Sequence, residues 1–226
     1  MTNIKKFSKR LNALADLVNK NYDLADIGSD HGFLITILVN KGFKNKLLAV
    51  ENKKGPFEGL KENLDSLHKD NIFYSLSNGL EEAPENYKTY VIAGMGFSTI
   101  QSIINNDIEK VKKAKYLIID CHTNQTEVRQ FITKIGYRII NEKVIYEDKI
   151  YYDLICFENT NEHVEYSDVE LKYGPINIRN LEPDFIGYLD SQLLQKTKIL
   201  EYKKNEKDIE ILRKEIEEIL KIKDGK

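Results

Sequence analysis

Acidic residues and glycines occur in this sequence where short apolar runs end. The first run, Asp23–Ile27, contains Asp26 and leads into Gly28 and Ser29. Glycine permits the backbone angles of a tight strand-to-helix turn, and the free N–H groups at a helix start can bind a carboxylate or a ribose. The next glycine is Gly32, so the spacing is G-x-x-x-G and not the G-x-G-x-x-G that accommodates a pyrophosphate. A ligand without a pyrophosphate is therefore favoured over a dinucleotide.

Three further features of this kind follow along the chain. Glu51 ends the second apolar run, where a carboxylate can accept hydrogen bonds from both hydroxyls of a ribose. Asn78 follows the third run, and its amide can read an adenine edge. The glycines of Ala93–Gly96 follow the fourth run and allow a substrate to approach the backbone. Each feature alone also suits an ordinary turn, but together they mark the carboxyl ends of successive strands, where open α/β sheets bind ligands.

The elements that must position these residues alternate between strand and helix patterns. Strands are predicted over Asp23–Ile27, Lys46–Glu51, Asn71–Leu76, Thr89–Gly94 and Lys115–Asp120. Helices are predicted over 31–42, 55–69, 97–111 and 124–135. This alternation indicates βαβ units around a parallel sheet.

The pattern changes after residue 136. Tyr137–Tyr146 and Ile150–Phe157 are strand-like runs joined by Glu147-Asp148-Lys149, which predicts an antiparallel hairpin. Five βα units followed by a hairpin are typical of the α/β, Rossmann-like sheet of class I methyltransferases, which is mostly parallel with an antiparallel terminal hairpin. A doubly wound dehydrogenase would continue with parallel units.

The C-terminal part has a helical pattern. Two apolar series recur at helical spacing, Ile186, Leu189, Leu193 and Leu200, then Ile209, Leu212, Ile216 and Ile219. The second series steps as a coiled-coil seam does. A turn at Lys204–Glu206 would give an antiparallel helical hairpin, which we favour, and one long helix with a stutter is the alternative. The chain is therefore divided into a methyltransferase-like domain, residues 1–159, and a helical coiled-coil-like domain, residues 160–226.

Composition narrows the class of protein. The 226 residues are 41% hydrophobic and 31% charged, which excludes wholesale disorder. Apolar runs stay well short of the ~20 residues of a membrane span, and the N-terminus shows no signal segment. Two cysteines, Cys121 and Cys156, make neither a disulfide framework nor a zinc site. We therefore expect a cytoplasmic protein with no metal and no membrane contact.

The net charge of −2 is unevenly distributed. Residues 1–159 carry a net charge of +1 and residues 160–226 a net charge of −3. The first ten residues hold four cations and no acid, namely Lys5, Lys6, Lys9 and Arg10. Phosphate binding depends on local positive charge, so the overall charge is compatible with a nucleic-acid ligand and predicts a small phosphate footprint.

Taken together, the motifs resemble the bacterial tRNA (adenine-N1)-methyltransferase family that acts at adenosine-22 of tRNA, known as TrmK. The resemblance covers residues 8–157. It is carried by Asp26-Ile27-Gly28-Ser29-Asp30-His31, Glu51 with Gly55-Pro56, Asn78-Gly79-Leu80, Ala93-Gly94-Met95-Gly96, Ser8-Lys9-Arg10-Leu11, Arg129 and Glu147-Asp148. It implies an enzyme that transfers a methyl group from S-adenosylmethionine to N1 of the adenine, leaving S-adenosylhomocysteine, with tRNA as its partner. A monomer is favoured.

By position, the resemblance implies a site for the cofactor and the substrate. The methionine end would meet Asp26, Gly28 and Ser29, the ribose Glu51, and the adenine Asn78. The full cofactor set is Asp26, Gly28, Ser29, Glu51, Asn52, Asn78, Gly79, Ala93, Gly94 and Met95. The substrate candidates are Lys9 and Arg10 for phosphates, Gly96 for the approach of the base, and Phe97, Phe33 and Tyr151 for stacking on it.

Two adjacent residues are catalytic candidates. Methylation leaves positive charge on the adenine ring, which a nearby carboxylate would stabilise. Asp30 is the first candidate for this role or for accepting a proton from the N6 amino group, and His31 is the second. A helix N-cap for Asp30 and an orienting hydrogen bond for His31 are the structural alternatives.

Three departures from the family pattern leave base recognition open. The family usually has an aspartate where this chain has Asn78, a second glycine where it has Phe97, and Gln-Pro-Asn where it has Asp120-Cys121-His122. Two other functions stay open. One is methylation of a small molecule or a protein by an enzyme of the same fold, and the other is a non-catalytic module that recruits a partner through its coiled coil.

Overall fold

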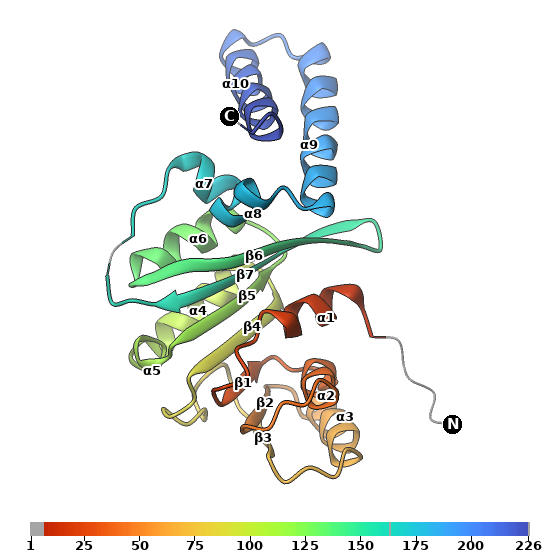
Figure 1. The fold of residues 1–226 in the computed structure, drawn as a ribbon, viewed down its shortest axis with the longest axis vertical. Helices are drawn as coiled ribbons and strands as arrows, with labels where there is room; N and C mark the ends of the chain where they lie inside the picture. Colours follow the sequence, from red (N-terminus) through yellow and green to blue (C-terminus); the bar gives the residue numbers. More distant parts are fainter. Residues whose placement is uncertain (1–6, 163, 226) are drawn as a thin grey trace.

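The structure, a computed structural model, describes residues 7–162 and 164–225 and contains a seven-stranded sheet (Figure 1). The strand order is β3-β2-β1-β4-β5-β7-β6. Strands β1 to β5 pair in parallel, and β7 runs antiparallel to both β5 and β6. The strands are β1 (Leu24–Ile27), β2 (Leu47–Glu51), β3 (Ile72–Leu76), β4 (Thr89–Met95), β5 (Tyr116–Cys121), β6 (Tyr137–Glu147) and β7 (Ile150–Asn159). The predicted Rossmann-like sheet, mostly parallel with an antiparallel terminal hairpin, is confirmed.

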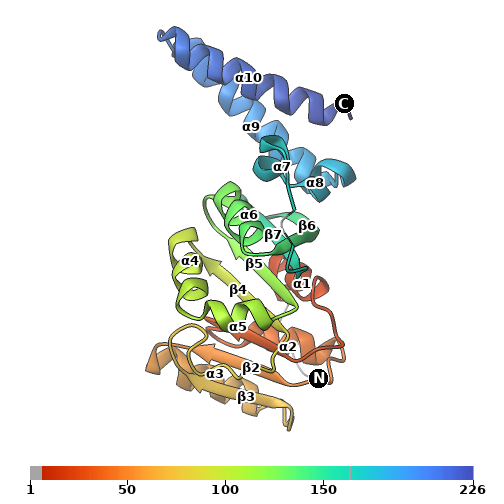
Figure 2. The same ribbon diagram turned by 90° about the vertical axis from the view of Figure 1, so that its left-hand side faces the viewer.

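Helices cover both faces of this sheet (Figures 1 and 2). Helices α1 (Lys9–Asp16), α2 (Phe33–Asn40) and α3 (Lys54–Asp65) pack on one face. Helices α4 (Phe97–Asn106), α5 (Ile108–Lys113) and α6 (Gln125–Lys134) pack on the other. All residues of β1, β2 and β5 are buried, because helices exclude water from both faces of these strands. The strand order reverses between β1 and β4, and this switch point opens a crevice at the carboxyl ends of the strands.

Two local predictions were wrong, and one helix was missed. The segment between β3 and β4 is a turn-rich loop and not the helix of a fifth βα unit, and Leu80, Ala83 and Tyr87 anchor it in the core. The helix predicted over 97–111 is two helices that meet at Asp107. Helix α1 was not predicted at all. It is short and begins among the cations of the N-terminus, so its amphipathic pattern spans barely two turns.

The predicted terminal hairpin is confirmed. Its turn consists of Asp148 and Lys149, which both have positive φ angles, 50° and 66°. Two left-handed residues in succession are the geometry of a type I′ turn, whose twist matches that of the flanking strands. The carboxylate of Glu147, next to this turn, accepts hydrogen bonds from the backbone N–H groups of Lys9 and Arg10 and so holds the start of α1 against the hairpin.

The C-terminal part begins with two short helices that return to the sheet. These are α7 (Asp168–Tyr173), which lies beside α6, and α8 (Pro175–Asn180), which lies beside β6. Helices α9 (Pro183–Tyr202) and α10 (Glu206–Lys223) then form a hairpin that projects away from the sheet (Figure 2). The break at Lys203–Asn205 confirms two helices over one long helix, and the Asn205 side chain caps α10.

A buried ionic cluster joins the sheet to the C-terminal helices. The guanidinium of Arg129 on α6 is fully buried and bonds to Glu142 at 2.7 Å and to Asp153 at 2.5 Å. It also donates to the Leu171 carbonyl oxygen on α7, and Glu142 accepts the backbone N–H of Ile176. One arginine therefore bridges α6, the β6–β7 hairpin and the segment that leads to α8.

Candidate active site

Two adjoining cavities occupy the crevice at the switch point. The larger has a volume of about 460 Å³ and the smaller about 150 Å³. Gly28, Asn52 and Met95 line both of them, so the two form one groove along the ends of β1, β2 and β4. This is the place that the strand-end motifs predicted for a ligand.

At the end of β1, a buried carboxylate faces the larger cavity. Asp26 lines this cavity and accepts a hydrogen bond from the Ser29 hydroxyl at 2.6 Å. Burial raises the pKa of Asp26 to about 6, and the bond from Ser29 opposes that rise only in part. Gly28 has a φ of +74°, and a Cβ at this position would overlap the Met95 methyl group. The turn therefore requires glycine and leaves room for a ligand beside Asp26.

Glu51 presents a pre-arranged carboxylate at the end of β2. The residue is buried, and its Oε1 accepts the backbone N–H groups of Asn52 at 3.0 Å and Lys53 at 2.9 Å. Among the described residues, these two are the hydrogen bonds that Glu51 forms, and both use Oε1. Its other oxygen, Oε2, is therefore available to a ligand in the larger cavity, which Glu51 lines. A carboxylate fixed in this way can accept a pair of ribose hydroxyls without further ordering.

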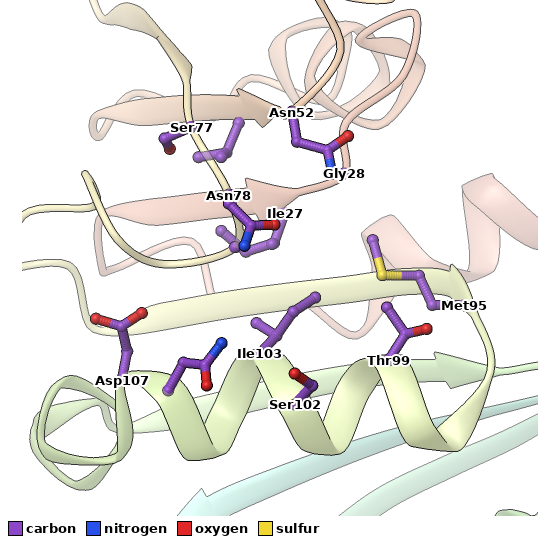
Figure 3. Close-up of a pocket in the computed structure, with 13 residues that line it drawn as sticks. Ile27, Gly28, Asn52, Ser77, Asn78, Met95, Thr99, Ser102, Ile103 and Asp107 are labelled. Atoms are coloured by element: carbon purple, nitrogen blue, oxygen red, sulfur yellow. The ribbon is translucent and has the colours of Figure 1, made fainter.

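The smaller cavity is a slot between two loops and a helix (Figure 3). The amide of Asn78 points across it toward α4, where Thr99 and Ser102 lie on the opposite side. Gly79 has a φ of +59° and lies so close to Ile103 that a Cβ would be 3.2 Å from that side chain. A narrow slot with apolar walls and amides at its edge suits a planar heterocycle.

Asp30 and His31 occupy different positions relative to the larger cavity. Asp30 lines its mouth, and its side chain is 70% exposed. The N-cap of α2 is Gly32, so the N-cap alternative for Asp30 is wrong. The His31 Nε2 lies 3.7 Å from Asp30 Oδ1, and the imidazole packs on Phe33, with 5.3 Å between ring centroids. His31 is therefore next to the carboxylate at the mouth of the cavity, and it is not itself among the residues that line the cavity.

The basic residues at the start of α1 are held by acidic partners. Arg10 lines the larger cavity, bonds to Asp120 at 2.6 Å, and lies 4.8 Å from the Tyr152 ring centroid. Lys9 bonds to Asp184 on α9 at 2.5 Å. Contrary to the sequence-based expectation, neither is a free surface cation, because tertiary contacts pair both. Lys5 and Lys6 lie outside the described residues.

The predicted stacking residues are dispersed. Phe33 and the backbone of Gly94 line the larger cavity, as do Ala93 and Met95. Contrary to expectation, Phe97 lies against Phe131 beside the core, with 6.1 Å between ring centroids. Tyr151 is not among the residues that line the larger cavity either, and its ring contacts Tyr188 of α9. Gly96 is the N-cap of α4. For Tyr151, which lies on β7, the reason is that consecutive strand residues face opposite sides of the sheet. The sequence did not show which side Tyr151 faces.

Two residues beyond β4 were missed. His122, which follows β5, lines the larger cavity near Gly94. Asp120 is fully buried behind Arg10, and desolvation raises its pKa while Arg10 opposes that rise. Their place at a strand end was the available signal. No sequence signal marked the residues of α4 that line the smaller cavity, which are Thr99, Ser102 and Ile103. A helical pattern does not show which turn of the helix faces a ligand.

Neither a metal centre nor a membrane-spanning helix is found among the described residues. They contain no group of three or more His, Cys, Asp or Glu side chains placed to hold a metal ion. Their helices also include none with the length and apolarity that a membrane crossing requires.

Comparisons with known proteins agree with this geometry. A family model described as a methyltransferase domain matches residues 7–155. The chain is 28% identical to the tRNA (adenine(22)-N(1))-methyltransferase of Bacillus subtilis (strain 168) over 171 residues, which is 75% of this chain and 72% of that protein. It is 30% identical to M. capricolum TrmK, solved with S-adenosylhomocysteine, with a TM-score of 0.82 and coverage of 97% of this chain and 98% of the other. The crystal structure of B. subtilis TrmK shares the fold, with a TM-score of 0.81, 23% identity, and coverage of 96% and 98%.

Proposed function

The chain belongs to the TrmK family of methyltransferases, and from this premise we propose that it transfers a methyl group from S-adenosylmethionine to N1 of adenosine-22 in tRNA. The observation that carries the proposal is the two-part groove at the ends of β1, β2 and β4. The B. subtilis relative with this activity matches 75% of the chain, and the match to M. capricolum TrmK covers 97% of it and so extends into the C-terminal helices. This coverage favours an RNA substrate over a small molecule or a protein.

The residues that line the groove suit the proposed cofactor in their chemistry. Asp26 would hold the ammonium group of its methionine part, Glu51 the ribose hydroxyls, and Asn78 the adenine in the smaller cavity. When bound, the cofactor supplies an electrophilic methyl group on a sulfonium. The positive φ of Gly28 and Gly94 brings bare backbone to the groove, so the ligand can approach closely.

The residues of the larger cavity would position the target adenine. N1 is already a nucleophile, so most of the rate enhancement comes from orientation. The ring gains positive charge as it is methylated, and the Asp30 carboxylate at the cavity mouth would stabilise that charge. His31 would orient Asp30. Phe33, which lines the same cavity, is the proposed stacking surface for the base.

Cofactor binding is expected to weaken as the pH falls through 6. The ammonium group binds the ionised form of Asp26, whose pKa is raised to about 6, so between pH 7 and pH 5 the affinity should fall about tenfold. Isothermal titration calorimetry measures this change. Asp26→Asn should bind more weakly at pH 7 and show a flatter pH profile, and a flat wild-type profile would contradict the assignment.

The raised pKa of Asp26 also makes the stability of the free protein depend on pH, and this stability changes with pH in the direction opposite to cofactor affinity. Because the folded-state pKa of Asp26 lies above the ordinary value of 3.8, ionised Asp26 destabilises the fold. Its contribution to stability is therefore greatest below pH 3.8 and falls as the pH rises through 6.

The proposed function is tested by nucleoside mass spectrometry of tRNA. We expect 1-methyladenosine at position 22 in cells that contain the protein and its loss in cells that lack it. With purified protein, a transcript with adenosine at position 22 should accept a methyl group, and a matched transcript with guanosine there should not. Methyl incorporation that survives ribonuclease would favour a small-molecule or protein substrate, and failure to bind S-adenosylmethionine would favour a non-catalytic module.

The remaining assignments follow from the function and are part of the proposal. Residues 1–159 would form the catalytic domain and residues 160–226 a helical domain that helps to hold tRNA. We propose that the protein acts as a monomer, since one chain lines the whole groove. Its site of action would be the cytoplasm, where its tRNA substrate is found.

A further inference from the structure

The smaller cavity of the groove continues into a different space at each end. The residues that it shares with the larger cavity are Gly28, Asn52 and Met95. Beyond its other end lies an outer pocket of about 350 Å³, and the residues that it shares with this pocket are Asn78, Asn106 and Asp107. Figure 3 shows Met95 and Asp107 on opposite sides of the smaller cavity.

This arrangement decides how an adenine ring would lie in the smaller cavity. Glu51, the proposed ribose ligand, lines the larger cavity, so the base would enter the smaller cavity from that end. In adenine, the bond to the ribose and the 6-amino group lie at opposite ends of the ring system. The amino group would therefore point toward the far end, which Asn78, Asn106 and Asp107 form.

Asp107 is the one charged residue, among those that the structure describes, that lines the smaller cavity. Its side chain is 18% exposed, so the carboxylate is accessible to a ligand. The residue occupies the N-cap of α5, where an aspartate side chain ordinarily accepts a hydrogen bond from the free N–H groups of the helix. Asp107 forms no such bond. Helix capping therefore does not account for an acidic side chain at this position.

A lysine holds the Asp107 carboxylate next to the loop that carries Asn78. The Lys110 ammonium lies 3.3 Å from Asp107 Oδ1, and it donates hydrogen bonds to the carbonyl oxygens of Leu80 at 2.8 Å and Glu81 at 2.6 Å. Apart from this ion pair, the carboxylate has no side-chain hydrogen bond among the described residues, so an oxygen stays available to a ligand. The two walls of the cavity are thus joined, and the acceptor is fixed in place before a ligand binds.

We propose that Asp107 recognises the 6-amino group of the cofactor's adenine together with Asn78. This inference rests on the proposed function. The amino group has two N–H donors, and the Asn78 amide oxygen and the Asp107 carboxylate would accept one each from the two walls. An amide can turn to present a donor or an acceptor, whereas a carboxylate presents acceptors only. Asp107 therefore makes the site selective for a purine with an amino group at this position over one with a keto oxygen.

Two ligands that differ at this position test the inference. S-adenosylhomocysteine has an amino group at C6 of its purine, and S-inosylhomocysteine has an oxygen there. Calorimetry should show that the wild type binds the adenosine compound about 100-fold more tightly or better, because a site built for an N–H group rejects a ligand that lacks it. Asp107→Asn should reduce this preference about tenfold or more, because the new amide can donate a hydrogen bond to the keto oxygen.

Glu109→Gln is the matched control. Glu109 lies on the same helix, but its side chain is 75% exposed and pairs with Lys112, and it lines neither cavity of the groove. The substitution removes one negative charge close to the site, and we expect both affinities to stay as in the wild type. The preference is a ratio measured on one protein, so a general loosening of the fold would weaken both ligands alike.

The outcomes separate this inference from the proposed function. If the wild type methylates tRNA and Asp107→Asn keeps the full preference for S-adenosylhomocysteine, the role of Asp107 is wrong and the proposed function stands. Equal weakening of both ligands in Asp107→Asn would reduce Asp107 to a structural support. An equal change of preference in Glu109→Gln would show a general effect of charge, and either result overturns the inference. If the wild type binds neither ligand nor S-adenosylmethionine, the proposed function falls as well.

Discussion

We expect Asp30→Asn to slow methyl transfer to tRNA by about 100-fold or more and to leave cofactor binding unchanged. The substitution removes the charge that faces the methylated ring and keeps the shape of the side chain. Asp30 has a φ of +49°, and asparagine tolerates this left-handed conformation better than alanine does. The side chain is 70% exposed, so the fold should be unaffected. Single-turnover assays and calorimetry with S-adenosylhomocysteine measure the two effects separately.

His31→Ala is the control for the Asp30 variant. His31 lies beside the cavity, 3.7 Å from the Asp30 carboxylate, so its removal should reduce the rate less than loss of that carboxylate does. If Asp30→Asn instead loses affinity for S-adenosylhomocysteine, Asp30 belongs to the cofactor site. A rate close to that of the wild type would remove it from the mechanism.

Arg129→Met is expected to reduce the free energy of unfolding by about 3–5 kcal/mol. The side chain is fully buried between Glu142 and Asp153, and methionine fills much of the space without the charge. Two carboxylates would then stay in the interior with no cation. Urea unfolding at pH 7, followed by circular dichroism because the chain has no tryptophan, measures the loss.

Arg138→Met is the matched control for this effect. Its guanidinium bonds to Glu158 at 2.6 Å, but the side chain is 51% exposed, so we expect a loss of about 1 kcal/mol or less. The deficit of Arg129→Met should also shrink between pH 7 and pH 5, because unpaired buried carboxylates have raised pKa values and become protonated. Equal losses in the two variants, or a deficit that grows at pH 5, would contradict this account of the cluster.

The strand-end motifs predicted much of the candidate groove. Asp26, Glu51 and Asn78 are far apart in the sequence, yet all line the two adjoining cavities. Parallel strands bring their carboxyl ends to one edge, so a strand pattern plus a polar residue at each end is enough to place them there. Glycines at the turns predicted unusual backbone angles, and Gly28 and Gly94 do have positive φ angles. The close approach of a substrate to their backbone stays a prediction.

The sequence did not predict which way side chains point or which charged side chains form pairs. Tyr151 and Tyr152 are adjacent, but one faces α9 and the other faces Arg10, because successive strand residues point to opposite faces. The packing of α1 and α9 on the hairpin decides which of the two tyrosines faces the active site. In the sequence Arg10 has the pattern of a surface cation, and only the fold places Asp120, 110 residues away, beside it.

Local periodicity and a fixed rule of sheet geometry were enough to predict the parallel sheet, the terminal hairpin and the residues at the strand ends, and they favoured a helical hairpin over one long C-terminal helix. The partners of Lys9 and Arg10 and the burial of Arg129 emerge only in the tertiary structure. These depend on contacts between elements far apart in the chain, and the energy of such contacts comes from packing and burial that no local pattern records.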